Sequence, residues 1–239
     1  MLKLDNVTLL ALGSTEIQEN LMSLKYSMRN ISFGDVKFIS HEEPKRMPSQ
    51  IKYEKFIGFD KIDYKEFSYY CIYNLIEHVD TDFVLMIHPD GFVINPESWS
   101  DEFLDFDYIG APWPIKNDAF IDPFGNHQRV GNGGFTLRSR KVLETPRKYK
   151  VPFEVNEGDF YKHMNAGAYN EDGNICVHNK HIFEKNGCKF APVDLAAMFS
   201  HEIPTPETKP IKKPFGFHRY FPGTYPRRFN FKKLQGVQL

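Results

Sequence analysis

The chain has 239 residues, with 30 lysines and arginines against 31 aspartates and glutamates and a formal net charge of −1. This balance gives no reason to expect nucleic acid as a partner, because proteins that bind the phosphate backbone carry a marked basic excess. The length suits one large α/β domain or two small ones, and we expect one. The three cysteines have no CxxC spacing, so they indicate neither a disulfide framework nor a zinc site and fit a reducing compartment.

The first part of the chain alternates strand and helix patterns. Apolar patterning predicts a strand, a helix and a second strand over Val7–Leu12, Glu16–Ile31 and Val36–Ile39. Ser14 and Thr15 fall where the first strand gives way to the helix. Capping is their simpler role, and Thr15 is also a candidate contact to a phosphate or nucleotide. Residues 41–60 are predicted to be loop, with a short strand near Lys55–Gly58.

The clearest helix pattern covers Asp63–Val79, with Asp63 as its cap. Tyr64 and Ser68 on this helix are candidates to face a nucleotide base, and packing is the alternative. The apolar residues Phe83–Ile87 follow, and a run of five is right for a strand buried on both faces.

No segment approaches the roughly 20 apolar residues of a membrane span, and the N-terminus lacks a signal-peptide pattern, so we expect a cytoplasmic protein.

This strand ends abruptly in His88, Pro89, Asp90 and Gly91. Open α/β sheets bind their ligands beyond the carboxyl ends of the strands, where Asp90 would lie. His88 and Asp90 are two residues apart, so an extended backbone would point both side chains to one side. Together they could hold one divalent cation, manganese or magnesium. The alternative is a simple Asp-Gly turn after the strand.

Aromatic residues and glycines gather further along the chain. Trp113 lies in a proline-bounded turn after a short strand that starts at Tyr108. Its simpler role is packing, and its functional role would be an aromatic plate against a sugar ring. Three glycines within Gly131–Gly134 let a backbone come close to a ligand. The GxGxxG and GK[ST] motifs are absent, which disfavours a Rossmann dehydrogenase and a P-loop NTPase.

Two adjacent carboxylates, Glu171 and Asp172, precede a helix pattern over Ile175–Asn186. They could stabilise the helix dipole or supply a general base. Residues 189–199 are predicted to be a strand. The remainder, residues 203–239, is rich in proline and basic side chains. Such a segment would be drawn to an anionic surface, either lipid headgroups or substrate phosphate, or would form a solvated tail.

In this order, the blocks DGF, DYIGAPW, VGNGGFTLRSRK, NED and PFGFH resemble those of a family of bacterial glycosyltransferase-like proteins. The resemblance extends from about Tyr64 to His218. It implies an α/β chain with a single GT-A-like, Rossmann-like domain, whose central mixed, mostly parallel sheet is flanked by helices. We expect this domain over residues 1–202, with a nucleotide-sugar half at about 1–114 and an acceptor half at about 115–202. Residues 203–239 would wrap the domain and carry His218.

The resemblance also implies a divalent metal cofactor, Mn²⁺ or Mg²⁺. GT-A enzymes hold the metal at an Asp-x-Asp motif after a central strand, and the matching positions are His88 and Asp90, of which only the second is an acid. Such enzymes often take a further ligand from a histidine near the C-terminus. His218 in the block PFGFH looks like that element, and His201 is its rival.

Glu171 and Asp172 resemble the acidic pair that supplies the catalytic base, and we favour Asp172 as the base. A sugar hydroxyl that attacks an anomeric carbon needs a base, and the departing nucleoside diphosphate needs positive charge nearby. The expected donor-binding residues are Thr15, Tyr64, Ser68, His88, Asp90, Gly91, Gly133, Gly134, Lys213 and Arg219. The expected acceptor-binding residues are Trp113, Asn132 and Phe135.

The predicted function is transfer of a sugar from a nucleotide-sugar donor to a glycan or lipid-linked acceptor in bacterial surface polysaccharide synthesis. The basic C-terminal segment would add a peripheral contact with the inner face of the membrane. The alternative is a non-catalytic carbohydrate or nucleotide-binding module on the same fold, with His88 in place of an acid as the sign of lost chemistry. In such a module, Glu171 and Asp172 have no reason to face the metal cleft. A metal-dependent hydrolase ranks third, because it would need a denser set of ligands.

Overall fold

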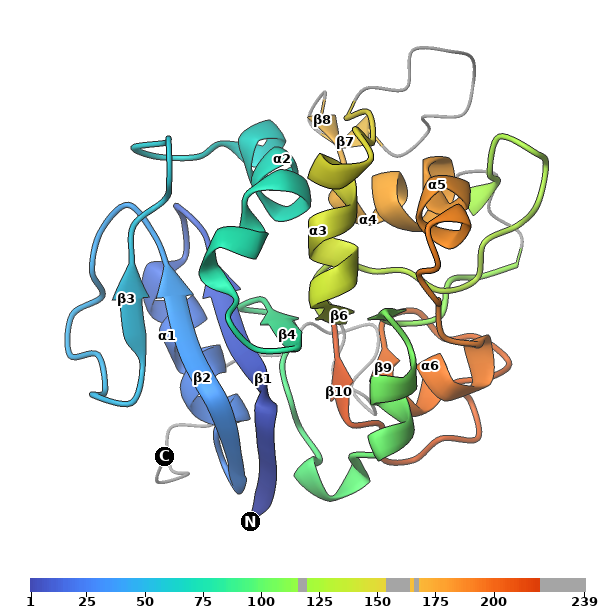
Figure 1. Ribbon diagram of the computed structural model, residues 1–239. Coiled ribbons are helices and arrows are strands. Elements are labelled where there is room, and N and C mark those ends of the chain that lie inside the picture. The colour runs from blue at the N-terminus through green and yellow to red at the C-terminus, as the bar shows by residue number, and fades with distance from the viewer. Residues whose placement is uncertain (116–119, 154–163, 166–167, 220–239) are drawn as a thin grey trace.

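A computed structural model describes residues 1–115, 120–153, 164–165 and 168–219 (Figure 1). Its centre is a six-stranded sheet in the order β3-β2-β1-β4-β6-β5. The strands are β1 Leu2–Leu12, β2 Ile31–Ile39, β3 Lys52–Glu54, β4 Phe83–Ile87, β5 Tyr108–Ile109 and β6 Phe135–Ser139. Neighbouring strands are parallel except around β6, which is antiparallel to β4 and β5. The predicted α/β class with a mixed, mostly parallel sheet is therefore confirmed.

Helices and short strands surround this sheet. The helices are α1 Ile17–Ser27, α2 Tyr64–Tyr73, α3 Arg140–Lys148, α4 Glu171–Gly173, α5 Lys180–Lys185 and α6 Val193–Phe199. Shorter helical turns cover Leu75–His78, Pro96–Ser98, Asp101–Asp105 and Asn174–His178. Two small ladders pair β7 Met164–Asn165 with β8 Ala168–Tyr169, and β9 Ser200–His201 with β10 Gly216–Phe217. Together these elements cover both faces of the central sheet (Figure 1).

The central strands are apolar on both sides. In β1, Leu9 and Ala11 pack with α1, while Leu10 and Leu12 pack with α2 and α3. Successive side chains of a strand point to opposite faces, so a strand covered on both faces needs a continuous apolar run. Four of the five residues of β4 are buried, and its residues divide between the same two cores. This explains why the short apolar run predicted β4 correctly.

The strand order creates a crevice between β1 and β4. The chain leaves β1 toward β2 and β3 on one side, and β4 then pairs with the other side of β1. At such a switch point the connections diverge, which opens a ligand-binding crevice outside the carboxyl ends of the strands. The residues that enter this crevice are Gly13–Glu16 after β1 and His88–Gly91 after β4. The topology thus brings the two segments singled out in the sequence to one place.

Some predicted elements were wrong. The strand expected near Lys55–Gly58 lies at β3, and the strand expected over 189–199 contains helix α6. In α6, the buried residues Leu195 and Phe199 are four positions apart, and Ala196 between them is also buried. This spacing is helical, but nearly all residues of the short segment are apolar, so the period could not be recognised in the sequence. Strand β1 starts at Leu2, ahead of the predicted boundary, because exposed side chains interrupt its apolar pattern there.

The two predicted helix caps had different outcomes. Asp63 caps α2, because its carboxylate accepts from the N–H of Glu66 at 2.8 Å and the Glu66 side chain accepts from the N–H of Asp63 at 2.9 Å. Ser14 and Thr15 do not cap α1, whose N-cap is Glu16 in the left-handed region at φ 51°. The Ser14 hydroxyl instead accepts from the N–H of Ile62 at 2.8 Å and thereby ties the turn after β1 to the start of α2.

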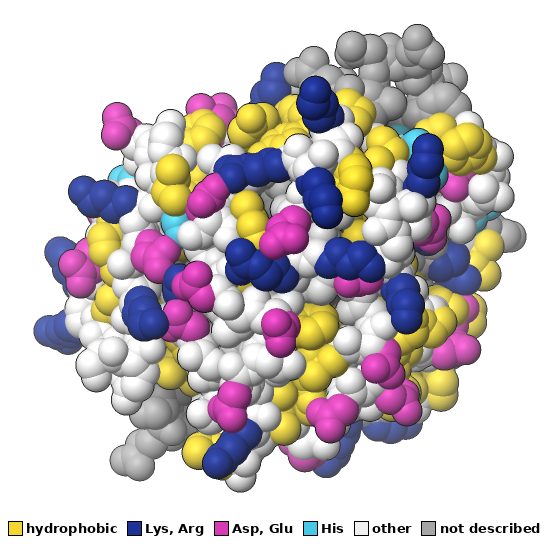
Figure 2. Space-filling view, in the orientation of Figure 1, with side chains coloured by type: hydrophobic (Ala, Val, Ile, Leu, Met, Phe, Trp, Pro, Cys, Tyr) yellow, Lys and Arg dark blue, Asp and Glu magenta, His cyan; other side chains and the backbone are white. Residues whose placement is uncertain are grey.

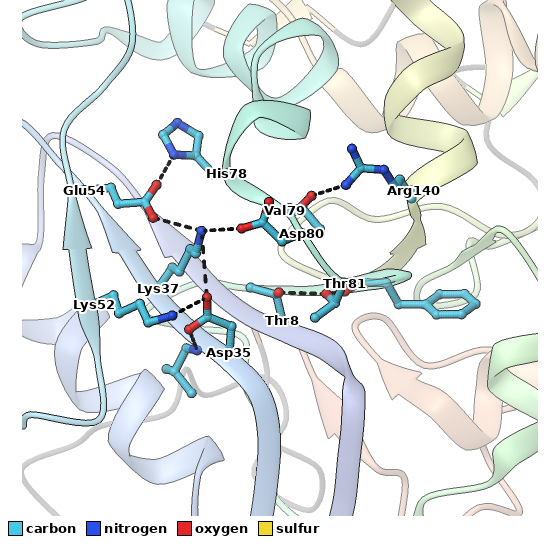
Figure 3. Close-up of polar contacts among 12 residues, drawn as sticks. Thr8, Asp35, Lys37, Lys52, Glu54, His78, Val79, Asp80, Thr81 and Arg140 are labelled. Atoms are coloured by element: carbon cyan, nitrogen blue, oxygen red, sulfur yellow. Dashed lines mark hydrogen bonds and ion pairs between the residues drawn. The ribbon is translucent and has the colours of Figure 1, made fainter.

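A buried lysine joins β2 to its neighbours on the side of the sheet that faces α2 (Figure 3). The ammonium group of Lys37, whose side chain is 6% exposed, lies 2.8 Å from Glu54, 3.5 Å from Asp80 and 3.8 Å from Asp35. The second oxygen of Glu54 lies 2.5 Å from Nδ1 of His78. This network links β2 and β3 to the segment that leads into β4.

We expect Lys37→Ala to lower the free energy of unfolding by about 2 to 3 kcal/mol. Removing one partner of a buried ion pair usually costs about 3 to 5 kcal/mol, and the loss here falls below that range because Asp80 is largely exposed and Glu54 partly so. Urea unfolding measures the change. Lys213→Ala is the matched control, because Lys213 and Glu97 are both exposed and such a pair contributes about 1 kcal/mol or less. Equal losses in the two variants would contradict the structural role of the Lys37 network.

The face of the molecule drawn in Figure 2 carries charges of both signs. Figure 2 shows lysine, arginine and acidic side chains interspersed over the face drawn there. None of the helices in the described part of the chain has both the length and the apolar character needed to cross a lipid bilayer. Most of the basic segment to which membrane contact was assigned, residues 220–239, lies outside the described residues.

Candidate functional site

A tight reverse turn ends strand β4. The N–H of His88 donates to the carbonyl of Gly91 at 2.9 Å, and the N–H of Gly91 donates back to the carbonyl of His88 at 3.1 Å. The extended backbone predicted from His88 to Asp90 is therefore wrong. The two side chains nevertheless converge, because His88, Asp90 and His218 each offer a ligand atom and these atoms lie within 4.8 Å of one another.

The C-terminal part of the described chain brings His218 to this turn. Strand β10 lies beside β9, and the N–H of His218 donates to the carbonyl of His201 at 2.8 Å. On the other side, the carbonyl of Phe215 accepts from the N–H groups of residues 94 and 95. The N–H of Arg219 donates to the carbonyl of Asp90 at 2.7 Å. Backbone hydrogen bonds therefore hold the segment on both sides of the histidine.

The His218 ring lies between two carboxylates. Its Nε2 is 3.5 Å from Oδ1 of Asp90, and its Nδ1 is 3.4 Å from Oε1 of Glu202. Burial alone would lower the pKa of His218, but hydrogen bonds and charge from Asp90 and Glu202 raise that pKa to about 9. Without a metal, the ring is therefore a cation that neutralises both acids. A divalent cation would take the place of this proton at Nε2.

His88 has the opposite character. Burial, together with the charge of His218, lowers the pKa of His88 to about 4, so its ring is neutral at neutral pH. Its Nε2 is buried and has no hydrogen-bond partner among the residues that the structure describes. A buried acceptor without a partner is costly unless something binds it. Two imidazole nitrogens and one carboxylate oxygen form a donor set that suits a divalent transition metal such as Mn²⁺.

The rival histidine does not join this group. Burial lowers the pKa of His201 to about 4, and its side chain is absent from the metal-ligating cluster that the described residues form. Its contribution is the backbone of β9, which positions His218.

The acidic pair belongs to the same region. One carboxylate oxygen of Glu171 lies 3.2 Å from the Nη2 atom of Arg138, and both side chains are buried. Arg138 comes from β6, where its Nε also donates to the Thr136 hydroxyl at 3.1 Å. A buried charge needs a partner of opposite sign, so Glu171 and Arg138 hold each other in place. Glu171 is thereby committed to an ion pair.

Asp172 is held by backbone groups instead. Its carboxylate accepts from the N–H of Gly133 at 3.1 Å and from the N–H of Gly173 at 2.7 Å. Burial and the neighbouring carboxylates of Glu171 and Glu202 raise the pKa of Asp172 to about 7, against the effect of these two hydrogen bonds. A carboxyl group that titrates near neutral pH is suited to take a proton from a substrate hydroxyl.

This shift predicts a pH-dependent stability. Because the folded pKa of Asp172 lies above its ordinary value of 3.8, folding favours the protonated form. We expect the contribution of this group to be most favourable below about pH 4, to decline as the pH rises to about 7, and to level off above that. Asp172→Asn should lack the decline, so its unfolding free energy relative to the wild type should rise between pH 4 and 7. Urea unfolding across this range measures the difference, and parallel curves would contradict the raised pKa.

Side chains from other segments of the protein pack directly against the backbone of the glycine-rich block. A Cβ atom on Gly134 would lie 2.1 Å from the His218 ring, one on Gly133 would lie 1.6 Å from the Glu171 carboxylate, and one on Gly131 would lie 1.9 Å from the Trp113 ring. No side chain fits at such distances. We predicted that these glycines admit a ligand, whereas the space above them holds the side chains that form the site.

A cavity of about 490 Å³ brings these groups together, a volume typical of ligand sites. The predicted residues that line it are Tyr64, His88, Asp90, Trp113, Asn132, Gly133, Gly134, Glu171, Asp172, His218 and Arg219. A second cavity of about 340 Å³ lies at the end of β1 and shares Tyr64, Phe67 and His88 with the first. The predicted residue Thr15 lines this second cavity.

Four predicted ligand contacts lie elsewhere. Ser68 is fully buried and cannot face a base, and Phe135 is a core residue against Phe199 and Phe215. The Lys213 ammonium lies 3.5 Å from Glu97, on a side chain that is 70% exposed and does not line the cavity. Gly91 is not among the residues that line the cavity, and a Cβ atom there would lie 2.5 Å from the carbonyl oxygen of Gly134. The structure thus buries Ser68 and Phe135 and leaves Lys213 and Gly91 outside the cavity lining, because sequence spacing does not show which side of an element faces the crevice.

Sequence reasoning also missed two residues of the site. Arg138 follows core residues in the otherwise apolar strand β6. The sequence signal for a functional or structural role was therefore a charged residue within an apolar strand. Glu202 comes directly after β9, at the end of a strand as Asp90 does. A buried charge at such a position indicates a partner from another segment, but the partner cannot be identified from the sequence alone.

The fold is that of GT-A glycosyltransferases, and solved structures share it at low sequence identity. An active-site mutant of LgtC is 12% identical, with a TM-score of 0.54 over 96% of this chain and 95% of that one. The glycosyltransferase GlyE of Streptococcus pneumoniae TIGR4 is 12% identical, with a TM-score of 0.50 over 93% of this chain and 56% of that one, and its apo form is similar. No curated protein sequence matches. The chain belongs to the family described as protein of unknown function (DUF5672), whose model matches residues 68–218.

Proposed function

We propose that this protein is a glycosyltransferase that moves a sugar from a nucleotide-sugar donor to the hydroxyl group of a glycan or lipid-linked acceptor. One observation carries the proposal: a single cavity is lined both by the cluster His88, Asp90 and His218 and by the acidic pair Glu171 and Asp172. A group that can hold a divalent cation and a carboxyl group suited to act as a base are the two parts that glycosyl transfer needs.

The donor would lie across the two cavities. His88, Asp90 and His218 would hold Mn²⁺ or Mg²⁺, and such an ion supplies positive charge to the diphosphate of the donor. Arg219, whose guanidinium group lies 3.6 Å from Glu202 beside the cavity, adds positive charge for the departing nucleoside diphosphate. The nucleoside would occupy the second cavity between the turn after β1 and Tyr64.

A buried amide supports this placement of the nucleoside. Oδ1 of Asn20 in the second cavity is buried and has no hydrogen-bond partner among the described residues. This oxygen is shut off from solvent, so the Asn20 amide would have to turn toward the cavity before the oxygen accepts from an N–H group of a base. Thr15, on the exposed turn beside it, offers a hydroxyl group to the ribose or phosphate.

Asp172 is the proposed base. When two neighbouring carboxyl groups have different environments, those environments indicate which group acts as the base. Here Glu171 is paired with Arg138, whereas Asp172 has no cationic partner within the described part of the chain. Asp172 would take the proton of the acceptor hydroxyl as that oxygen attacks the anomeric carbon. Glu171 would keep its ion pair and orient the helical turn α4 that carries the base.

The acceptor would enter beside Trp113. The Trp113 ring stacks on Phe120 with centroids 4.2 Å apart and planes inclined by 9°, and both rings line the larger cavity. Both rings are more than nine-tenths buried, so they contribute an apolar part of the cavity wall and not an open platform. With Asn132 nearby as a polar contact, this wall suits a carbohydrate acceptor. The resemblance to bacterial glycosyltransferase-like proteins is our ground for placing the reaction in surface polysaccharide synthesis at the inner face of the membrane.

The second candidate is a non-catalytic carbohydrate or nucleotide-binding module. The observation in its favour is His88, a neutral ligand where an acid would bind a divalent cation more strongly. The presence of Glu171 and Asp172 in the same cavity as the ligand cluster favours the transferase, because a binding module has no use for them there. Both candidates bind the same ligands, so turnover is the experiment that separates them.

The test is turnover of a panel of nucleotide-sugars with Mn²⁺, measured as release of nucleoside diphosphate with and without a mixture of glycan acceptors. We expect release with one donor class, and Asp172→Asn should lower the turnover by about 100-fold or more while leaving donor binding intact. Asp105→Asn, at an exposed acid outside the cavity, is the matched control and should behave as wild type. Metal-dependent binding without any turnover would favour the binding module.

A further inference from the structure

We propose that Glu202 is a positioning residue of the metal site: it fixes the orientation of the His218 ring so that Nε2 faces the cation, without contacting the cation itself. The inference deepens the proposed function, on which it rests, because it concerns the cation that His88, Asp90 and His218 would hold. Neither the sequence patterns nor the family resemblance assigned a role to Glu202.

The first observation is the arrangement of the His218 ring. Nε2 faces Asp90, the carboxylate of the metal-ligating cluster, at 3.5 Å, and Nδ1 faces Glu202 at 3.4 Å on the opposite side. A histidine that binds a metal through one nitrogen generally donates the N–H of the other to a carboxylate, which sets the tautomer and the direction of the ring. The ring of His218 lies between a ligand and such a carboxylate.

The second observation is that Glu202 stands outside the cluster. Its carboxylate is not among the ligand atoms that lie within 4.8 Å of one another. The same oxygen that faces Nδ1 also lies 3.6 Å from the guanidinium group of Arg219, and the side chain is 8% exposed. A carboxylate buried between two cationic groups has little freedom to turn toward a third.

The fold fixes the pairing of these two residues. Strands β9 and β10 run parallel with His201 opposite Phe217, so Glu202 and His218 are the first residues beyond the ends of the two strands. The backbone hydrogen bond from His218 to His201 closes the ladder at this point. The carboxylate and the imidazole are therefore brought together by register.

The remaining freedom of the ring is a flip about its axis. The His218 ring lies against the Gly134 backbone, where a Cβ atom would come within 2.1 Å, and 5.7 Å from the ring of His88. Packing of this kind restricts the plane of the ring. It does not distinguish the two flipped orientations, which exchange a nitrogen for a carbon at each edge. Attraction between Nδ1 and the Glu202 carboxylate, which lie 3.4 Å apart as an ion pair, selects the orientation that directs Nε2 at the cation.

The experiment measures Mn²⁺ affinity of the full chain, without substrate, from the electron paramagnetic resonance signal of free Mn²⁺. We expect Glu202→Ala to weaken binding by about 10 to 100-fold, the usual effect of removing a partner of a ligating histidine. Glu202→Gln keeps an acceptor for the Nδ1 proton and should recover part of the affinity. Glu207→Ala is the control, since this carboxylate of the same segment pairs with Arg129 and does not line the cavity, and it should bind Mn²⁺ as the wild type does.

A double variant separates positioning from direct contact or long-range charge. In a His218→Ala background, Glu202→Ala should cause no further loss of Mn²⁺ affinity, because Glu202 acts through the ring. A full additional loss in that background would overturn the proposal, as would wild-type affinity in Glu202→Ala. Asp90→Asn is measured alongside. If it loses binding while Glu202→Ala does not, only the role of Glu202 fails, whereas a wild-type chain that binds no Mn²⁺ contradicts the metal site as well.

Discussion

Asp90→Asn is expected to abolish the manganese-dependent binding of the nucleotide donor. Asp90 supplies the only carboxylate among the three clustered ligands, so its replacement removes the negative charge that holds the cation. The loss should exceed the roughly 10 to 100-fold effect that is typical of a residue behind the ligands. Isothermal titration of the protein with nucleoside diphosphates in the presence and absence of Mn²⁺ measures it.

The control for this variant keeps the chemistry of the change and moves it away from the cavity. Asp105→Asn should bind the donor as the wild type does, because Asp105 is exposed and does not line the cavity. The Asp90→Asn protein should stay folded without ligand and lose some stability, because the cationic His218 ring loses one carboxylate partner and keeps the other, Glu202. Unchanged donor affinity in a folded Asp90→Asn protein would exclude Asp90 as a ligand.

Glu171→Ala is expected to lower the free energy of unfolding by about 3 to 5 kcal/mol, the usual cost of leaving a buried charge without its partner. The guanidinium group of Arg138 is fully buried, and its ion pair with Glu171 is the one charged contact recorded for it among the described residues. Urea unfolding followed by tryptophan fluorescence measures the change, because Trp113 is buried in the same cavity wall.

Two further variants test the cause of this loss. Adding Arg138→Met to Glu171→Ala should recover part of the stability, because the unpaired charge is then removed. Glu184→Ala breaks an ion pair with Lys180 that is exposed on the glutamate side, and should cost about 1 kcal/mol or less. If the double variant were less stable than Glu171→Ala alone, the loss would come from packing and not from the uncompensated charge.

Those elements of the fold could be predicted whose apolar residues follow the pattern of either a strand or a helix clearly. The five apolar residues of β4 and the capped helix α2 are local signals, and the structure contains both. Helix α6 was missed because its seven residues are nearly all apolar, and a short apolar run does not distinguish a strand from a helix. Strand β6 was not predicted as a separate element, because it follows the glycine-rich block directly and the charged Arg138 interrupts its short apolar pattern.

The site could be predicted only in part, because its members come from distant segments. The position of Asp90 after a buried strand is a local signal, and the resemblance named His218 as its partner. The ion pairs Glu171 with Arg138 and Glu202 with His218 depend on the approach of β6 to α4 and on the register of β9 and β10, which no spacing in the chain encodes. For the same reason the sequence placed Ser68 and Phe135 in the site, although the structure buries both.

The central claim is that the two adjoining cavities hold a nucleotide donor through a divalent cation, and the melting temperature of the full chain tests it most directly. A ligand that binds only the folded state at 100 times its dissociation constant adds about 2.7 kcal/mol. For a chain of this length, that corresponds to a rise of about 5 to 10 °C. We predict such a rise with one class of nucleoside diphosphate or nucleotide-sugar, in the presence of Mn²⁺ and not in its absence. A melting temperature that no nucleotide raises, with or without Mn²⁺, would contradict the proposed function.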